Sequence, residues 1–177
     1  MFTGLRDVVE ENRVENLHSM VKVTLTVDVP RLSYAGRSLE DLKKGTVLNV
    51  WRWVADVLVA RRCAEYVSKQ SLANQLLQIE WREKNNPGEL QPLQKHFYVE
   101  LLREGVQDDY VVKKLRDILT MRMMKIVSIA AKRLDGEIMR RMTPEEEALY
   151  KAVYRVVDEW LKAIGSGEGG GDGGATS

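Results

Sequence analysis

Residues that could perform nucleophilic or metal chemistry are few in this chain. It contains one cysteine, Cys63, and two histidines, His18 and His96, which lie far apart in the sequence. A single cysteine can form neither an intrachain disulfide nor a cysteine-based zinc site, and two isolated histidines lack metal-ligand spacing. We therefore expect no catalytic, cofactor-binding or metal-binding residues and no cofactor. A small enzyme is the least favoured of the functions considered.

Two groups of neighbouring carboxylates are the remaining candidates for acid–base chemistry. They are Asp108–Asp109 and Glu145–Glu146–Glu147. Both groups lie where helices are expected to begin, and acidic side chains there stabilise the positive end of the helix dipole. We interpret both groups as helix caps and not as catalytic pairs.

The strongest charge feature is the stretch 113–141, which carries nine basic and three acidic residues. One interpretation is a local patch for nucleic acid or an acidic protein. Its candidate residues are Lys113, Lys114, Lys132, Arg140 and Arg141. The other interpretation is a solvated helix face, with Arg122 and Arg133 near the apolar seam and paired with acids on neighbouring helices. We favour the second, because helical spacing scatters these charges and the stretch has no aromatic residue for base stacking.

The secondary structure expected to position these residues changes along the chain from mainly strands to helices. Residues 1–67 are predicted to form a small β-rich domain. The alternation of Val21–Val29 predicts a half-buried strand that Pro30 ends, and Thr46–Val50 predicts a second strand. Turns are expected at Tyr34–Arg37 and Leu42–Thr46. The spacing of apolar residues in Trp51–Cys63 then predicts a helix.

Residues 68–164 are predicted to form an α-helical domain with four helices. The expected ranges are 68–85, 92–104, 108–134 and a final helix that begins after Thr143. The third helix is expected to bury a seam of five apolar residues, namely Val112, Leu115, Leu119, Ile126 and Ile129. Thr143 and Glu146, with Pro144 between them, have the spacing of a capping box.

The fold class that follows is α+β and mainly α, with a small β-rich domain before a helical bundle. Residues 165–177 hold seven of the 13 glycines and no large apolar side chain, so we expect a disordered tail. The net charge of +1 disfavours a globally cationic nucleic-acid binder. The N-terminus has no signal-peptide pattern and no stretch is long enough to span a bilayer, so a cytoplasmic protein without membrane contact is expected.

Some apolar and aromatic residues are candidates for contact with other proteins. The candidate subunit-interface residues are Phe97, Leu101, Leu102, Val111, Leu115, Met123 and Met124. If Trp51 and Trp53 lie on one helix, they point to different faces, so Trp51 is expected in the core and Trp53 at a contact surface. Trp81 lies on the polar side of its predicted helix and is a second candidate for partner contact.

The order of these parts resembles the subunits of the GINS complex of the replication fork. The resemblance rests on a small β module with a Lys–Gly turn, on Arg122, Lys125 and Ile126 in the long helix, and on the helix that begins with Thr143, Glu145 and Glu146. The β module stands before the helical domain, as in the archaeal subunit type with that order. The resemblance spans roughly residues 21–164.

This resemblance implies a non-enzymatic scaffold subunit that acts at the replication fork. It implies assembly with a related GINS subunit, as a 2:2 heterotetramer or a homo-oligomer. Other implied partners are the MCM helicase, a RecJ-like nuclease relative and, in some lineages, primase or polymerase. Weak or no direct DNA binding is expected. The alternative is a nucleic-acid-binding regulator that uses the basic helix 113–141; such a regulator would bind duplex alone with a steep salt dependence.

Overall fold

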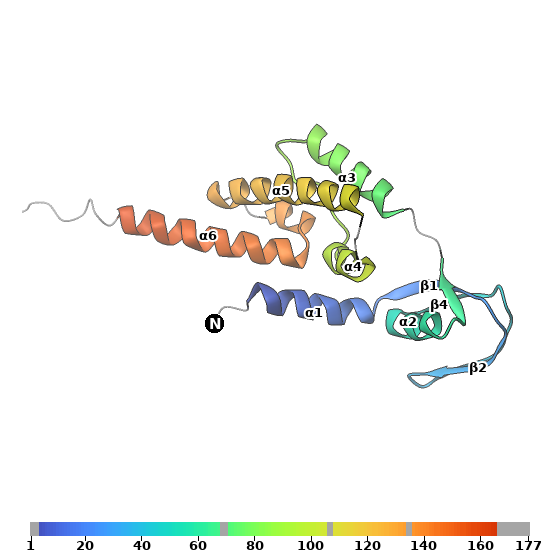
Figure 1. Ribbon diagram of the computed structural model, residues 1–177. Helices are drawn as coiled ribbons and strands as arrows, with labels where there is room; N and C mark the ends of the chain where they lie inside the picture. Colours follow the sequence, from blue (N-terminus) through green and yellow to red (C-terminus); the bar gives the residue numbers. More distant parts are fainter. Residues whose placement is uncertain (1–3, 68–70, 106–107, 134–135, 166–177) are drawn as a thin grey trace, which may run out of the picture. The chain divides into compact units, whose positions relative to one another are not determined.

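The structure, a computed structural model, consists of two compact units (Figure 1). It describes residues 4–67, 71–105, 108–133 and 136–165. One unit comprises Val9–Ser71, and the other comprises Leu72–Ser177 together with Met1–Val8. A small β-rich region precedes a bundle of helices, so the predicted fold class is confirmed. The first element is helix α1 (Leu5–Leu17).

The β unit is built on an antiparallel three-stranded sheet in the order β4-β1-β5. Its strands are β1 (Met20–Leu25), β4 (Val47–Trp51) and β5 (Ala64–Tyr66), and helix α2 (Arg52–Ala60) packs on them. Val21 pairs with Val50 and Val23 with Leu48, so the apolar residues of both strands share one face. That face and the apolar side of α2 form the core of the unit.

The first strand is shorter than the alternation predicted, and Pro30 does not end it. β1 stops at Leu25, and Pro30 lies inside the next strand, β2 (Val29–Tyr34). Two side chains hold the segment between these strands outside the sheet. The Thr26 hydroxyl donates to the carbonyl of Arg62 at 2.8 Å, and Asp28 accepts from the backbone N–H of Lys44 at 2.7 Å.

Strand β2 pairs with β3 (Arg37–Leu42) in a separate two-stranded hairpin. Its turn is the one predicted at Tyr34–Arg37. The two central residues, Ala35 and Gly36, both have positive φ (44° and 77°). Positive φ at both positions is typical of the type I′ turn that two-residue hairpin loops prefer. The second predicted turn is also present, since the backbone N–H of Thr46 donates to the carbonyl of Lys43 at 3.0 Å.

The prediction that Trp51 and Trp53 lie on different faces of one helix is wrong. Trp51 is the last residue of β4, and α2 begins at the next residue. The two rings lie 6.1 Å apart, and the ring of Tyr34 packs edge-on to both. Both tryptophans are therefore half-buried members of one aromatic cluster that joins the hairpin to the sheet and α2.

The helical unit contains four α-helices and one short 3-10 helix within its described residues. These are α3 (Leu72–Asn85), α4 (Phe97–Glu104), α5 (Asp109–Ala131), η1 (Gly136–Arg141) and α6 (Pro144–Gly165). α4 begins later than expected, because residues 90–94 form neither helix nor strand and a turn closed by the Phe97 N–H to the Gln94 carbonyl (3.0 Å) precedes the helix. Gly105, in the left-handed conformation (φ 59°), caps its end as expected for glycine.

Helices α5 and α6 lie side by side and run in the same direction (Figure 1). The ion pairs show this directly, because Arg122 of α5 pairs with Glu146, and Arg133, just after the end of α5, pairs with Asp158 further along α6. Helix α3 packs on another side of α5. One apolar cluster forms around Leu76, Phe97, Leu101 and Ile118, and a second joins the C-terminal half of α5 to α6.

The buried face of α5 differs from the predicted seam. Ile118 and Ile126 are fully buried and Leu115 is half-buried, whereas Val112 and Leu119 are exposed. Ile129 is buried as well, so the predicted seam is correct at its C-terminal end and wrong at Val112 and Leu119. Arg122, which was expected near this seam, is only 1% exposed and lies within it. A pattern based on apolar residues alone cannot place such a position.

Two predictions about organisation fall outside the described residues. The predicted domain boundary after residue 67 adjoins 68–70, and the predicted disordered tail, residues 165–177, lies outside the described residues except for its first residue. Of the tail, the structure describes Gly165, the last residue of α6. Within the described residues, no helix is both long and apolar enough to cross a membrane.

Candidate functional site

The start of α6 is fixed by the capping box that the sequence predicted. The backbone N–H of Thr143 donates to Glu146 Oε2 at 3.1 Å, and the backbone N–H of Glu146 faces the Thr143 hydroxyl at 3.4 Å. Both side chains are buried. The box therefore satisfies helix-end donors and also holds the Glu146 carboxylate inside the bundle.

Arg122 of α5 reaches this carboxylate from the neighbouring helix. Its Nε donates to Glu146 Oε1 at 2.6 Å and its Nη2 to Glu146 Oε2 at 2.8 Å, which is a two-bond arginine–carboxylate pair. The Tyr98 hydroxyl of the α4 helix donates to Glu146 Oε1 at 2.6 Å. One carboxylate thus joins α4, α5 and α6.

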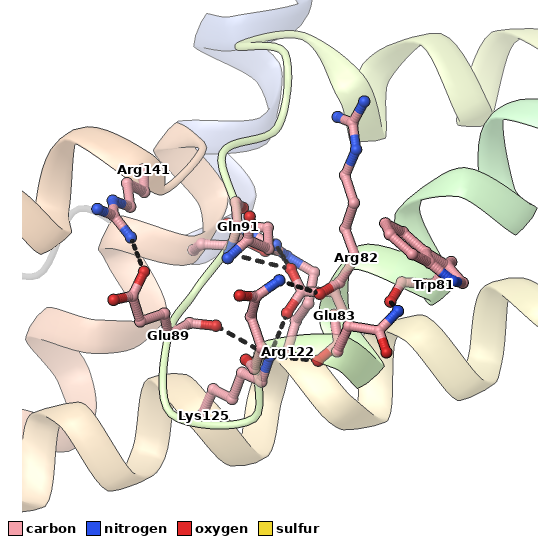
Figure 2. Close-up of polar contacts among 11 residues, drawn as sticks. Trp81, Arg82, Glu83, Glu89, Gln91, Arg122, Lys125 and Arg141 are labelled. Carbon is pink, nitrogen blue, oxygen red and sulfur yellow. Dashed lines mark hydrogen bonds and ion pairs between the residues drawn. The ribbon is translucent and has the colours of Figure 1, made fainter.

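The remaining guanidinium nitrogen of Arg122 faces α3 (Figure 2). It pairs with the fully buried carboxylate of Glu83 and donates to the carbonyl of Gln91 at 2.7 Å. The backbone N–H of Gln91 donates in turn to Glu83 Oε1 at 3.2 Å. Both the N–H and the carbonyl of Gln91 are therefore bound to the network, which fixes the segment between α3 and α4 against α5.

Lys125, one helical turn after Arg122, caps the C-terminal end of α3 (Figure 2). Its Nζ donates to Glu83 Oε2 at 2.6 Å and to the carbonyls of Glu83, Asn86 and Glu89 at 2.8, 2.7 and 2.9 Å. These carbonyls belong to the end of α3 and the turn after it, where an ammonium group complements the negative end of the helix dipole.

The buried ion network, meaning Arg122, Lys125, Glu83, Glu146 and Tyr98, contains two cations and two carboxylates. Burial opposes the charged form of Arg122, but the hydrogen bonds and charge of Glu146, with the charge of Glu83, outweigh it and raise the pKa of Arg122. Burial, together with the charge of Glu146, also raises the pKa of Tyr98 well above its ordinary value. These two shifts favour a charged Arg122 and a neutral Tyr98.

A second ion cluster joins α3 to the first part of α5. Glu80 of α3 accepts from Lys114 at 2.8 Å and from Lys84 at 2.6 Å. The hydrogen bonds from Lys114 and then Lys84 lower the pKa of Glu80 despite its burial. Arg133 likewise pairs with Asp158 of α6. Arg122 and Arg133 therefore have the acidic partners on neighbouring helices that the favoured interpretation of the basic stretch predicted.

The five candidate basic-patch residues are in different environments. Lys114 is bound to Glu80, and Arg141 donates to Glu89 Oε2 at 2.8 Å. Lys113, Lys132 and Arg140 are exposed, but they come from the start of α5, its C-terminal cap and η1. The structure does not gather the five into a single row of cations along α5.

The candidate subunit-interface residues divide into a covered and an exposed group. Phe97 and Leu101 are buried and Val111 and Leu115 are half-buried, because these four pack together with Leu76 and Ile118 inside the helical unit. For Phe97 and Leu101 the prediction of a partner contact is corrected, since their apolar surface is covered within the chain. The exposed group consists of Leu102, Met123 and Met124.

The apolar spacing along α6 predicts one buried stripe from Leu149 to Ile164, and this prediction is wrong for the distal half of the helix. Leu149 and Val153 pack in the apolar cluster between α5 and α6. The same side of the helix continues through Val156, Trp160 and Ile164, which are 65%, 61% and 56% exposed. Figure 1 shows α6 extending beyond the end of α5. The apolar spacing was visible in the sequence. Only the relative lengths of α5 and α6 show where α5 stops covering the apolar side of α6.

The two tryptophans proposed for partner contact also differ. Trp53 belongs to the aromatic cluster of the β unit and is half-buried. Trp81 on α3 is 67% exposed. In Figure 2 it lies away from the ion network, as does Arg82.

The described residues contain no group of three or more His, Cys, Asp or Glu that could hold a metal ion. The predicted carboxylate pairs act at helix ends in this structure. Asp108 accepts from the backbone N–H groups of Tyr110 and Val111 at 2.8 and 3.1 Å, which caps α5. Together with Glu146 in the capping box, these contacts support the capping interpretation of both acidic groups.

The structure thus defines an α+β protein whose helical bundle is built around buried ion pairs, with a small β unit before it. Residues 72–165 match the family model of the GINS complex protein helical bundle domain. The match spans more than half of the chain, so this chain belongs to the GINS complex family, a family of non-catalytic scaffold proteins that act in DNA replication. Among curated proteins, no sequence matches this chain.

Proposed function

We propose that this chain is a scaffold subunit that joins a related GINS subunit through its helical unit and links the MCM helicase to other replisome proteins. The observation that carries the assembly step is the exposed apolar side of α6 beyond Val153. Three large side chains at helical spacing, Val156, Trp160 and Ile164, are more than half exposed. A contiguous apolar face of this kind marks a protein-interaction surface.

A second exposed apolar row supports assembly through more than one surface. Leu119, Met123 and Val127 follow one another at four-residue spacing on α5, and all three are exposed. The buried residues Ile118, Arg122 and Ile129 lie on another side of the same helix. Two uncovered faces on one subunit suit an oligomer of four chains, such as a 2:2 assembly, although one face alone would suffice for a dimer.

Partners beyond the GINS subunits follow from family membership and remain proposals. They are the MCM helicase, a RecJ-like nuclease relative and, in some lineages, primase or polymerase. We infer weak or no direct DNA binding, because two of the five candidate basic residues already have carboxylate partners. A direct DNA binder would instead lose affinity steeply and linearly with the logarithm of salt concentration.

The test of assembly is a substitution in the middle of the α6 face. We expect Trp160→Arg to abolish co-purification with a related GINS subunit, because it places a charge where an apolar contact is required. The masses of the complexes are measured by light scattering after co-expression. The control is Glu159→Arg, an exposed position on another side of the same helix.

Thermal unfolding of each variant alone shows whether the bundle remains intact. Because Trp160 is largely exposed, we expect Trp160→Arg to shift stability little. If the Trp160→Arg variant still forms the complex of full mass, the distal half of α6 is not the subunit interface. If both variants lose assembly, the effect is one of overall charge.

A further inference from the structure

Three connecting segments meet at the end of the β unit where β1 stops. They are residues 26–28 after β1, residues 43–46 before β4 and residues 61–63 after α2. The backbone N–H of Thr26 donates to the carbonyl of Cys63 at 2.9 Å, and the Thr26 hydroxyl donates to the carbonyl of Arg62 at 2.8 Å. Asp28 accepts from the backbone N–H of Lys44 at 2.7 Å. Hydrogen bonds therefore fix both of the other segments to residues 26–28.

These two segments are basic and exposed. Their cations are Lys43, Lys44, Arg61 and Arg62. Lys43 lies 3.5 Å from Asp28, and the backbone hydrogen bond from Lys44, followed by the charge of Lys43, lowers the pKa of that carboxylate. The side chains of Arg61 and Arg62 form no ion pair or hydrogen bond with any described residue.

Two further acids adjoin the basic segments, namely Asp41 in β3 and Glu65 in β5. Both are exposed, and neither forms an ion pair within the described part of the chain. With Asp28, Asp41 and Glu65 all included, the cations still outnumber the carboxylates. The end of the β unit is therefore positive, and its excess charge belongs to side chains that nothing in the chain binds.

The backbone after α2 has a form that favours glycine. The N–H of Arg62 donates to the carbonyl of Val59 at 2.9 Å, and the N–H of Cys63 donates to the carbonyl of Leu58 at 2.9 Å. This pair of bonds is the Schellman motif, in which the residue after the C-cap is usually glycine. Here that residue is Arg62, with φ 59°. A left-handed backbone is unfavourable for a residue with a Cβ atom.

A second arginine with positive φ provides a comparison. Arg133 has φ 55°, and its side chain pairs with Asp158 of α6. The arginine side chain at 133 is therefore used within the chain, whereas that of Arg62 is not. An arginine held in an unfavourable conformation without an internal partner points to an external one.

An apolar side chain stands between the two basic segments. Val27 is 43% exposed, and its neighbours Thr26 and Asp28 are the residues that bind the arginine and lysine segments. A single exposed valine needs no explanation by itself. Between two sets of exposed cations, it suits a ligand that carries an aliphatic side chain flanked by carboxylates.

We propose that this end of the β unit binds an acidic segment of a partner protein, with carboxylates at Arg61, Arg62 and Lys44 and an aliphatic side chain on Val27. Nucleic acid fits less well, because the three segments contain no aromatic residue on which a base could stack. Phosphates also repeat at every nucleotide and would meet the Asp28 carboxylate, whereas a peptide can place its acids on either side of it. The proposal does not depend on subunit assembly, since it uses residues of the β unit alone.

The first test separates binding from folding. The probe is a fluorescein-labelled peptide in which one leucine stands between two pairs of glutamates, and its binding to the full chain is followed by fluorescence anisotropy. Arg62→Gly removes the guanidinium and relieves the left-handed backbone. We expect a higher midpoint of thermal unfolding together with peptide binding weakened by about threefold or more. A variant that is more stable and still binds the peptide normally would contradict the proposal.

The second test removes both arginines. We expect Arg61→Gln with Arg62→Gly to weaken binding by about tenfold or more, and Arg61→Lys with Arg62→Lys to retain most of it. The control is Arg13→Gln with Arg37→Gln, which removes the same charge from exposed positions of α1 and the hairpin. The control should bind within about threefold of the unchanged chain. Thermal unfolding verifies that each variant is folded.

A third substitution tests the apolar centre without changing charge. The unchanged chain should prefer the leucine peptide over a matched serine peptide by about threefold or more, and Val27→Ser should remove that preference. The Trp160→Arg variant should bind the peptide normally, and the variant without both arginines should still join a related GINS subunit. These two results separate this proposal from the assembly proposal.

Three further results would overturn the proposal. They are equal weakening in the arginine and control variants, absence of peptide binding up to about millimolar concentration, and tighter binding of an oligonucleotide that competes with the peptide. The first would assign the effect to overall charge, and the third would make this surface a nucleic-acid site.

Discussion

Arg122 connects three parts of the helical unit. It contacts carboxylates from two helices and a carbonyl from the segment between α3 and α4. A buried ion pair gains little over a well-packed apolar replacement, because both charges must be taken out of water. Removing only one partner is different, since the other charge is then left buried without compensation.

We therefore predict that Arg122→Met lowers the free energy of unfolding by about 3–5 kcal/mol. Lys125 still neutralises Glu83 in this variant, so the carboxylate left unpaired is that of Glu146. Urea denaturation measures the change. Adding Glu146→Gln should restore part of the loss, because the amide oxygen still accepts from Tyr98 without a charge. A loss below about 1 kcal/mol for Arg122→Met alone would contradict this account.

At the residue scale, the sequence predicted that certain basic side chains form ion pairs, but not which acidic residues they pair with. It indicated that Arg122 and Arg133 would be paired with acids on neighbouring helices, and the ion pairs confirm this. It could not identify those acids, because the contacts of Arg122 join residues 24 and 39 positions away. It also could not show that Lys125 would bind three backbone carbonyls, since that depends on how the turn after α3 packs on α5.

The sequence predicted most accurately the ends of helices that are fixed by residues close together in the chain. Thr143 and Glu146 fix the start of α6 by contacts within four residues, so the sequence alone was enough. Trp51 was misplaced because its apolar spacing suits a helix, whereas pairing with Met20 makes it the end of a strand. Along α5, the predicted seam is correct at Ile126 and Ile129 and wrong at Val112 and Leu119.

At the level of the element, we predict that Thr143→Ala lowers the free energy of unfolding by about 1 kcal/mol through loss of the helix cap. Chemical denaturation of the full chain measures the difference. Thr143→Ser keeps the hydroxyl that faces the Glu146 N–H and should cost much less. If the serine variant is as unstable as the alanine variant, the buried methyl group and not the cap accounts for the role of Thr143.

At the scale of the whole molecule, the two units have separate cores. Both apolar clusters of the helical unit and its buried ion network lie between residues 72 and 165, and the β-unit core lies between residues 21 and 64. From the change of pattern after residue 67, the sequence predicts domains at 1–67 and 68–164. It could not predict which surfaces would be left uncovered, because that depends on helix lengths and packing.

We predict that residues 68–165 expressed alone fold into the helical unit. Circular dichroism should show a cooperative urea transition at the same midpoint as the helical transition of the full chain, because the buried contacts described above are kept. The isolated residues 9–71 serve as the comparison for the β unit. A helical fragment that binds hydrophobic dyes and melts without cooperativity would show that its core needs the rest of the chain.

The attachment of α6 at one end has a mechanical consequence. The 22-residue helix is held at its start by Glu146 and is paired with α5 as far as Asp158, beyond which its apolar side chains are exposed. Because the contacts with α5 extend to Asp158, only the last turns of α6 can move without breaking them. At about 1.5 Å per residue these turns span about 10 Å, so a bend of about 10° after Asp158 moves the end of the helix by only about 2 Å. The contacts between α6 and α5 therefore fix the position in which Trp160 and Ile164 are presented to a partner.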